Sequence, residues 1–169
     1  HMSKFSGKRV VITGAGRGIG LAIAHAFARE GAKLAIISRN PTSCGAAAKE
    51  INAIHPDSTR FYALDVADFD SVQETGKTIV EDLGGIDILI NNAGVFATPD
   101  PITKDGMDIR FAVNTMAPYL LIQRLLPLLG KSGCVLISSS AANRLLTWMP
   151  WQVVSHCRTE WPMLKVSLR

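Results

Sequence analysis

The sequence predicts an α/β fold in which helices cover both faces of a doubly wound parallel sheet. Short apolar runs rich in β-branched residues alternate along the chain with longer segments whose apolar residues recur at helical spacing. Strands that are apolar throughout are typical of sheets buried on both faces. With 169 residues, of which 47% are hydrophobic, the chain is long enough to form one domain with a substantial core.

The first half of the chain predicts two strands and two helices in alternation. A β-branched run over residues 8–13 ends in a glycine-rich turn, and the helix that follows should end at Gly31. A second strand is predicted over Lys33–Ser38. The second helix is predicted over Pro41–Ile54, because the first turn of a helix tolerates proline.

The second half continues the alternation. Strands are predicted over residues 60–66 and 86–91, with a helix over about residues 68–83 between them. A long apolar-rich helix is expected over residues 106–129, and a fifth strand over residues 134–138.

The pattern stops after about Ala142. All three tryptophans lie at position 148 or beyond, and residues 144–169 show neither the period of a strand nor that of a helix. We therefore divide the chain into a domain over residues 3–142, whose sheet is incomplete on its C-terminal side, and a tail over residues 143–169.

Charge and cysteine content argue against several classes of function. The net charge of +4 comes from scattered lysines and arginines, so no nucleic-acid partner is expected. Cys44, Cys134 and Cys157 are widely spaced and form no close Cys/His pair, which predicts free thiols in a reducing compartment and no metal site. No apolar run approaches the roughly 20 residues of a membrane span, and the N-terminus shows no secretory pattern. A cytoplasmic protein without a membrane span is expected.

The turn after the first predicted strand has the features of a dinucleotide-binding loop. It reads TGAGRGIG over residues 13–20 and opens the first helix. A glycine-rich turn alone serves any tight turn, but here strand, spacing and helix agree. Gly14 and Gly18 should leave room for a pyrophosphate, and the helix N-terminus offers unpaired N–H groups. The candidate cofactor-binding residues of this loop are Thr13, Gly14, Gly16, Arg17, Gly18, Ile19 and Gly20.

The spacing Thr-Gly-x-x-x-Gly-x-Gly resembles the short-chain dehydrogenase/reductase family, and further motifs follow in the family's order over residues 7–142. Asp65 and Val66 resemble the segment whose aspartate contacts the adenine ring. Asn92, Ala93 and Gly94 are similar to the motif that stabilises the sheet and lines the cofactor pocket. The resemblance implies a Rossmann-like fold and an enzyme that interconverts a carbonyl and an alcohol by hydride transfer with NAD(P)(H).

Two residues match the catalytic tetrad of the resembled family. Asn114 matches the helix asparagine that holds a water in the proton relay, and Ser139, by register, matches the serine that polarises the substrate oxygen. Simpler interpretations stay open for single residues: Asp65 could cap the next helix, Asn114 could satisfy a backbone kink, and residues 138–140 could be an ordinary polar strand end.

Cofactor preference depends on the end of the second strand, which reads Ser38-Arg39-Asn40. An acidic side chain there would bind the ribose hydroxyls of NAD and repel an added 2′-phosphate. An arginine grips a phosphate instead, and Arg17 adds a second positive group on the same side. We therefore expect NADP(H) to be preferred, with NAD(H) possible; the alternative is that both arginines are solvated surface residues.

The tyrosine and the lysine four residues later that complete the family's tetrad have no counterpart in the sequence. Tyr62 and Tyr119 both precede Ser139, and neither is followed by a lysine at that spacing. Trp161 and Lys165 have the spacing, but an indole N–H does not titrate usefully. The chain as written is expected to be catalytically impaired.

A shifted reading frame would explain the missing pair. Back-translation of residues 161–167 in another frame permits Ala-Tyr-Ala-Gln-Ser-Lys, which resembles the family's active-site helix, and no stop is forced back to Asn143. Residues 105–108 and 114–129 further resemble the retinol-dehydrogenase-like branch. The expected parent is a homo-oligomeric enzyme of that type acting on a small carbonyl or alcohol, with its assembly perturbed here. The alternative is a non-catalytic truncated isoform that binds a cofactor or a partner.

Overall fold

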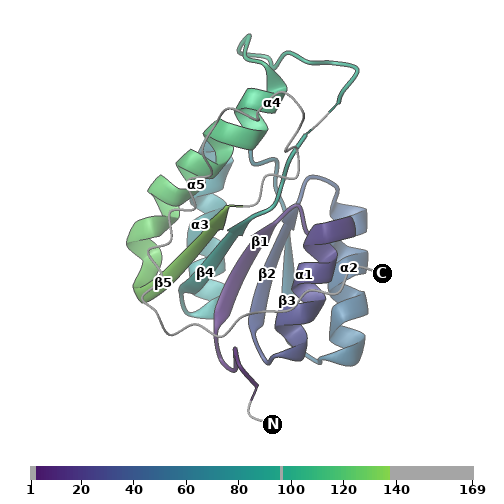
Figure 1. Cartoon of the computed structure of the whole chain (residues 1–169), viewed down its shortest axis with the longest axis vertical. Helices are drawn as coiled ribbons and strands as arrows, with labels where there is room; N and C mark the ends of the chain where they lie inside the picture. The colour runs from purple at the N-terminus through teal and green to yellow at the C-terminus, as the bar shows by residue number, and fades with distance from the viewer. Residues whose placement is uncertain (1–2, 96, 138–169) are drawn as a thin grey trace.

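The computed structural model describes residues 3–95 and 97–137. A five-stranded parallel sheet runs through the middle of the molecule in the order β3-β2-β1-β4-β5 (Figure 1). The predicted doubly wound α/β fold is confirmed. The strands are β1 (Arg9–Thr13), β2 (Lys33–Ser38), β3 (Thr59–Ala63), β4 (Ile86–Asn91) and β5 (Leu129–Ile137).

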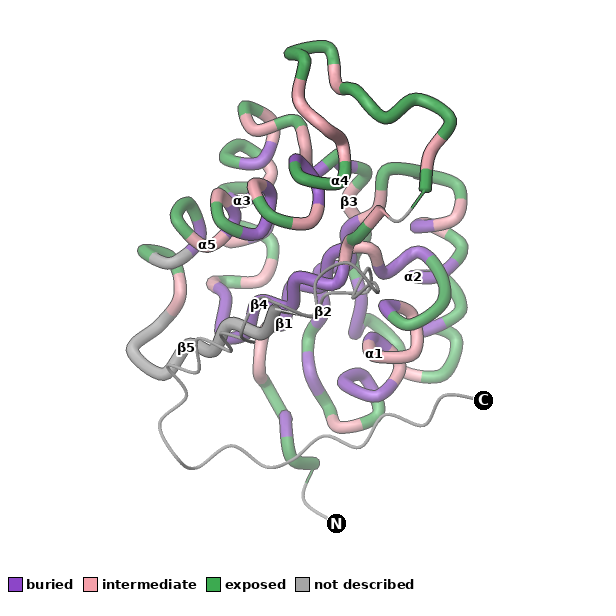
Figure 2. Tube along the Cα trace, turned by 45° about the horizontal axis from the view of Figure 1, so that its top comes forward, coloured by how far each residue is buried: buried purple, intermediate pink, exposed green. Residues whose placement is uncertain are grey.

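Helices cover both faces of the sheet (Figure 2). Helices α1 (Gly18–Arg29) and α2 (Pro41–Ile54) lie on one face. The other face carries α3 (Phe69–Leu83) and a continuous helical segment, whose successive parts are α4 (Ile109–Phe111), the π-helical turn η1 (Ala112–Met116), α5 (Ala117–Leu125) and the 3₁₀ turn η2 (Leu126–Leu128). Each face has its own apolar core, since neighbouring residues of a strand point to opposite sides.

The burial of the strands explains their apolar composition. All six residues of β4 are buried, whereas β3, at one edge of the sheet, buries only Thr59. The carboxyl ends of the strands point toward α4 and the loop over residues 97–108, at the top of Figure 1. The helices that follow β1 and β2 lie on one face and those that follow β3 and β4 on the other, so the strand order reverses between β1 and β4. In open α/β sheets such a reversal point is where ligands bind.

An ion pair joins β1 and β4 at the opposite end of the sheet. The Arg9 Nε and backbone N–H both donate to Asp87 Oδ2 at 2.9 Å, and the guanidinium also donates to the Gly84 carbonyl. The hydrogen bond from Arg9 lowers the pKa of Asp87, although partial burial of the carboxyl opposes the shift. The pair therefore fixes the alignment of two central strands far from the loops.

The predicted helix over residues 106–129 is wrong at both ends. Residues before Ile109 form a small turn held by an antiparallel bridge between Ile102 and Asp108, and Asp108 then caps the helix by accepting the Arg110 N–H at 2.8 Å. At the other end the chain leaves the helical segment after Leu128 and starts β5 at Leu129, earlier than the predicted residue 134. A register shift between Ile86 and Ile88 accommodates this longer strand beside β4.

The predicted strand over residues 60–66 is displaced. β3 starts at Thr59, where the Asn52 side chain accepts the Thr59 N–H at 2.9 Å, and ends at Ala63. The one cysteine whose side chain is described, Cys44, is a buried free thiol, and desolvation raises its pKa. Among the described residues no helix is long and apolar enough to cross a membrane. The same residues hold no cluster of three or more metal-ligating side chains.

Candidate functional site

The glycine loop between β1 and α1 is folded tightly against the chain that follows β4. Gly14 has a φ of +66°, and a Cβ there would lie 2.8 Å from the Ala93 Cα. A Cβ at Gly20 would collide with the Gly14 carbonyl and lie 2.6 Å from the Asn92 amide nitrogen. A side chain at Gly14 would therefore meet the protein itself, and contact between the Gly14 backbone and a pyrophosphate stays a prediction.

Two buried side chains hold this packing together. The Thr13 hydroxyl accepts the backbone N–H groups of Asn92 and Ala93, each at 3.0 Å. The Asn92 amide donates to the Gly14 carbonyl at 3.2 Å. Thr13 and Asn92, both predicted as cofactor-binding residues, thus bind the loop to the end of β4. Direct contact between either residue and a cofactor stays a prediction.

The exposed part of the loop offers a place for a phosphate. Arg17, Gly18 and Ile19 are exposed, with Ile19 47% accessible. Gly18 has a φ of +58°, and a Cβ there would meet no protein atom within 4 Å. Helix α1 has no side-chain cap and no acidic residue in its first turn. Its first N–H groups are therefore available to an anion, and the residues present fit a dinucleotide pyrophosphate.

Helix α3 provides the contrast. Its cap Asp68 accepts the Ser71 N–H at 3.2 Å and the Ser71 hydroxyl at 2.7 Å, and these bonds lower the pKa of Asp68. Asp70 adds a second carboxylate in the first turn. An anion would be repelled there, so α1 differs from α3 in the property that phosphate binding requires.

The end of β2 and the start of α2 lie against the same loop. Asn40 caps α2, since its Oδ1 accepts the Thr42 N–H at 2.9 Å and the Ser43 N–H at 3.1 Å. A Cβ at Gly16 would lie 2.9 Å from the Ser38 Oγ and 3.0 Å from the Ser43 Oγ. Gly16 is therefore required for the loop to pack against these two serines.

Arg17 and Arg39 leave this region into solvent. Both are exposed, and neither guanidinium group has an ion-pair or hydrogen-bond partner among the residues that the structure describes. Of the other described arginines, those at positions 9, 60, 110 and 124 bind a neighbouring carboxylate or amide oxygen, whereas Arg29, in the last turn of α1, is also unpaired there. Unlike Arg29, Arg17 and Arg39 extend from the segments that meet at Gly16, so both are available to an anionic ligand at this site.

The Leu-Asp-Val segment follows β3 at the same edge of the sheet. The Leu64 N–H donates to the Ser38 carbonyl at 3.0 Å, which brings Asp65 next to the end of β2. Asp65 is exposed and its Oδ1 accepts the Ala67 N–H at 3.0 Å, whereas Val66 is buried. The alternative that Asp65 caps the next helix is wrong, because Asp68 does so.

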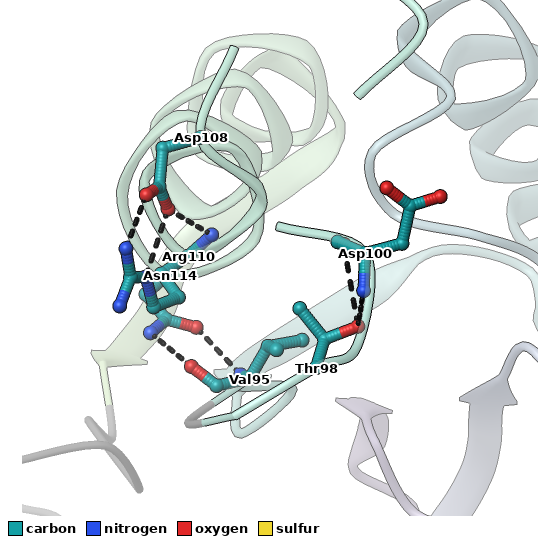
Figure 3. Close-up of polar contacts among 6 residues, drawn as sticks. All are labelled: Val95, Thr98, Asp100, Asp108, Arg110 and Asn114. Atoms are coloured by element: carbon teal, nitrogen blue, oxygen red, sulfur yellow. Dashed lines mark hydrogen bonds and ion pairs between the residues drawn. The ribbon is translucent and has the colours of Figure 1, made fainter. Parts of the chain in front are cut away.

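Asn114 makes a two-point contact with the chain after β4 (Figure 3). Its Oδ1 accepts the Val95 N–H at 2.8 Å, and its Nδ2 donates to the Val95 carbonyl at 2.9 Å. Asn114 lies within η1, where the Ala117 N–H bonds the Ala112 carbonyl five residues earlier. The Asn114 side chain bonds Val95 and no backbone group of η1, so the interpretation that it satisfies a kink in its own helix stays a prediction, as does its role in the proton relay. The Asn114 side chain thus positions Val95, which directly follows Asn92, Ala93 and Gly94. Of these, Gly94 is exposed.

Two short polar contacts border this region in Figure 3. Asp108 pairs with Arg110 at the start of α4, and the hydrogen bond from Arg110 lowers the pKa of Asp108. On the loop, the Thr98 hydroxyl donates to the Asp100 carbonyl at 3.3 Å.

Asn91 is a polar residue of this region that sequence reasoning missed. It is only 2% exposed, and neither its Oδ1 nor its Nδ2 has a hydrogen-bond partner within the described ranges. In the sheet it pairs with Ile137, directly before the serines at 138–140. A buried amide without partners is costly, so Asn91 marks a place where a further polar group is needed. The signal is an asparagine at the end of the buried strand β4, after the apolar run Ile88–Ile90.

The remaining predicted residues lie outside the described ranges. These are Ser139, the boundary at Ala142 and the tail with Trp161 and Lys165. Their predicted roles stay predictions.

Comparison with known proteins gives a consistent picture. A profile of the short chain dehydrogenase family matches residues 8–151. Human retinol dehydrogenase 13 is 40% identical over 130 residues, which cover 75% of this chain and 39% of that protein. D-threitol dehydrogenase of Mycolicibacterium smegmatis is 33% identical, and its alignment covers 97% of this chain and 63% of that protein. The chain thus spans about two fifths to two thirds of these relatives, and the last alignment reaches into the tail.

Solved structures agree with the fold. A short chain dehydrogenase from Burkholderia cenocepacia in complex with NADP is 34% identical, with a TM-score of 0.69 over 78% of this chain and 55% of that one. An NAD⁺-bound xylitol dehydrogenase is 30% identical, with a TM-score of 0.66 over 74% of this chain and 49% of that one. Proteins similar to this chain therefore include one bound to each of the two cofactors.

Proposed function

Since the chain belongs to the short-chain dehydrogenase family, we propose that its described part is the NADP(H)-binding portion of an oxidoreductase that interconverts a carbonyl and an alcohol. The observation that carries the proposal is the N-terminus of α1, which has neither a side-chain cap nor an acidic residue and lies beside open space at Gly18. Such an end binds a pyrophosphate through backbone N–H groups.

The preference for NADP(H) rests on Arg17 and Arg39. Both guanidinium groups are exposed and unpaired within the described residues, and Asn40 after them is neutral. A ribose 2′-phosphate would be bound by two cations and repelled by no carboxylate of that segment. The Burkholderia relative is solved in complex with NADP, which supports this choice. The xylitol dehydrogenase is solved with NAD⁺, so NADH is included in the binding test.

The chemistry divides between cofactor and protein. The nicotinamide supplies or accepts the hydride when bound. Asn114 holds the Val95 segment, because its amide oxygen and nitrogen both bind the Val95 backbone. Ser139 is proposed to polarise the substrate oxygen. The parent enzyme is proposed to be of the retinol-dehydrogenase type, with which this chain shares 40% identity over 130 residues.

No tyrosine of this chain is suited to move the proton. The Tyr62 hydroxyl donates to Asp82 Oδ2 at 2.6 Å, and burial together with that bond raises the pKa of Tyr62. Tyr119 is 56% exposed on α5, away from any lysine at the required spacing. General acid–base assistance is typically worth about 10²- to 10⁴-fold in rate. We therefore propose that the chain of 169 residues binds the cofactor and turns over no carbonyl above background.

The test measures binding and turnover separately. NADPH and NADH are titrated against the purified chain by fluorescence, and NADPH oxidation is then followed with a panel of aldehydes and ketones. Saturable NADPH binding without turnover supports the proposal. Absence of binding to both cofactors contradicts the cofactor assignment, and turnover that disappears in Ser139→Ala contradicts the proposed impairment.

A second candidate function is that of a non-catalytic partner-binding module. It is favoured by exposed aromatic residues on the helical segment over residues 109–125, where Phe111 is 49% and Tyr119 is 56% accessible. Exposed aromatic groups favour association. Light scattering after size-exclusion chromatography distinguishes the two candidate functions. A monomer that binds NADPH favours the cofactor-binding function, because it binds its ligand without a protein partner.

A further inference from the structure

We infer that Ser43, on the first turn of α2, is a third contact to the ribose 2′-phosphate and helps to set the preference for NADP(H). The inference rests on the proposed cofactor site and adds to it a residue that the sequence motifs do not contain. Three segments converge near Ser43: the glycine loop, the end of β2 and the start of α2.

The Ser43 hydroxyl lies beside the glycine loop. A Cβ at Gly16 would lie 3.0 Å from the Ser43 Oγ and 2.9 Å from the Ser38 Oγ. Gly16 directly precedes Arg17, and Ser38 directly precedes Arg39. The Ser43 hydroxyl is therefore next to the backbone from which both unpaired arginines extend.

The hydroxyl can turn toward a ligand. Its one hydrogen bond among the described residues is a donation to the Asn40 carbonyl at 3.2 Å, which is long for an O–H···O hydrogen bond. Ser43 is half-buried, so a group bound there would be partly shielded from water. Exchanging a long bond to a carbonyl for a bond to an ionised phosphate strengthens the contact, because charge-assisted hydrogen bonds are the stronger class.

The electrostatics of this corner favour an anion. Neither α1 nor α2 has an acidic residue in its first turn, and the cap of α2 is the neutral Asn40. The exposed carboxylate that follows β3, Asp65, accepts the Ala67 N–H. Two guanidinium groups, a helix N-terminus and a reorientable hydroxyl belong to the three segments that meet at Gly16, and these are donors of the kind that a phosphate monoester binds.

The experiment compares two serines at the same helix position. Ser43 is the third residue of α2 and Ser71 the third residue of α3, and both backbone N–H groups bond their cap. Ser43→Ala and Ser71→Ala are titrated by calorimetry with NADPH, NADH, adenosine 2′,5′-bisphosphate and adenosine 5′-monophosphate. Ser43→Ala should weaken binding of the two ligands that carry a 2′-phosphate by about five- to tenfold and leave the other two unchanged. Ser71→Ala should change none of them.

Two further variants separate the hydroxyl from the fold. Ser43→Thr keeps the hydroxyl and should restore affinity for adenosine 2′,5′-bisphosphate. Ser43→Asp should lower that affinity by at least about tenfold, while the melting temperature is kept because acidic residues are favoured in a first helical turn.

The outcomes distinguish this inference from the proposed function. Equal loss for ligands with and without the 2′-phosphate in Ser43→Ala, or no loss in either Ser43→Ala or Ser43→Asp, overturns the role of Ser43 while leaving the cofactor site in place. If the unsubstituted chain binds none of the four ligands, the proposed function fails and the role of Ser43 fails with it.

Discussion

Replacing Gly18 with alanine should abolish most NADPH affinity at a small cost in stability. The φ of Gly18 is +58°, and its Cβ would meet no protein atom within 4 Å. The fold therefore bears only the left-handed penalty of about 1–2 kcal/mol, which lowers the melting temperature by about 2–8 °C in a chain of this size. The added methyl would occupy the space assigned to the pyrophosphate. Loss of one charge-assisted hydrogen bond costs about 1.5–3 kcal/mol, or about 10- to 150-fold in Kd.

Gly7 provides the matched control for this variant. It has a φ of +71° and open space around its Cβ, but it precedes β1 at the opposite end of the sheet from the glycine loop. Gly7→Ala should lose a similar amount of stability and keep its NADPH affinity. Calorimetry with NADPH and thermal unfolding of both variants check this. If Gly18→Ala binds NADPH as tightly as Gly7→Ala does, the pyrophosphate does not lie over Gly18 and the reasoning is refuted.

Four further predictions concern the arginines, the Arg9–Asp87 ion pair, Gly14 and the reading frame of the tail. Arg17→Ala with Arg39→Ala should weaken NADPH binding and spare NADH, with the difference shrinking at high salt; equal loss for both cofactors would assign the arginines to the pyrophosphate. Asp87→Asn should lower the free energy of unfolding by about 1–3 kcal/mol at pH 7, as measured by urea titration. Because Arg9 lowers the pKa of Asp87 in the folded state, the carboxylate stabilises the fold fully above its unfolded pKa of about 4. The difference in unfolding free energy from Asp87→Asn should vanish as the pH falls through the folded pKa. A difference that stays constant down to pH 2 would contradict this. Gly14→Ala should destabilise the fold more than Gly18→Ala does, since its Cβ would lie 2.8 Å from the Ala93 Cα; equal melting temperatures would contradict the packing role. Restoring the alternate frame from about Asn143 in a full-length chain should yield turnover that tyrosine-to-phenylalanine replacement removes while NADPH still binds; an inactive repaired protein that binds NADPH would contradict the frame hypothesis.

Local rules predicted the elements whose ends are set by neighbouring residues. The helix Pro41–Ile54 has the predicted bounds because a proline follows the Asn40 cap, and both signals act within one turn. The strand Lys33–Ser38 also has the predicted bounds, since its apolar run is buried on both faces. These features need no knowledge of distant parts of the chain.

Long-range contacts explain the features that the sequence did not predict. The helix after β4 contains a π-helical turn where Asn114 binds Val95, nineteen positions away in sequence, and apolar spacing carries no trace of that bond. Gly14 is identified as a packing residue only when Ala93 is seen beside it. The motif predicted that Thr13 and Asn92 belong to the site, but their role in binding the loop to β4 required the fold.

The two halves of the proposed chemistry are carried by different kinds of structure. The proposed cofactor site uses backbone N–H groups and a few short side chains near the point between β1 and β4 where the strand order reverses, and the observations behind the proposal lie within the described residues. The proposed proton transfer requires a titratable group, which neither Tyr62 nor Tyr119 is suited to supply. The contacts that shape the proposed cofactor site join residues 13–20, 38–43 and 92–93. Because these contacts involve no group that transfers a proton, we propose that this chain binds NADPH without turning over a carbonyl.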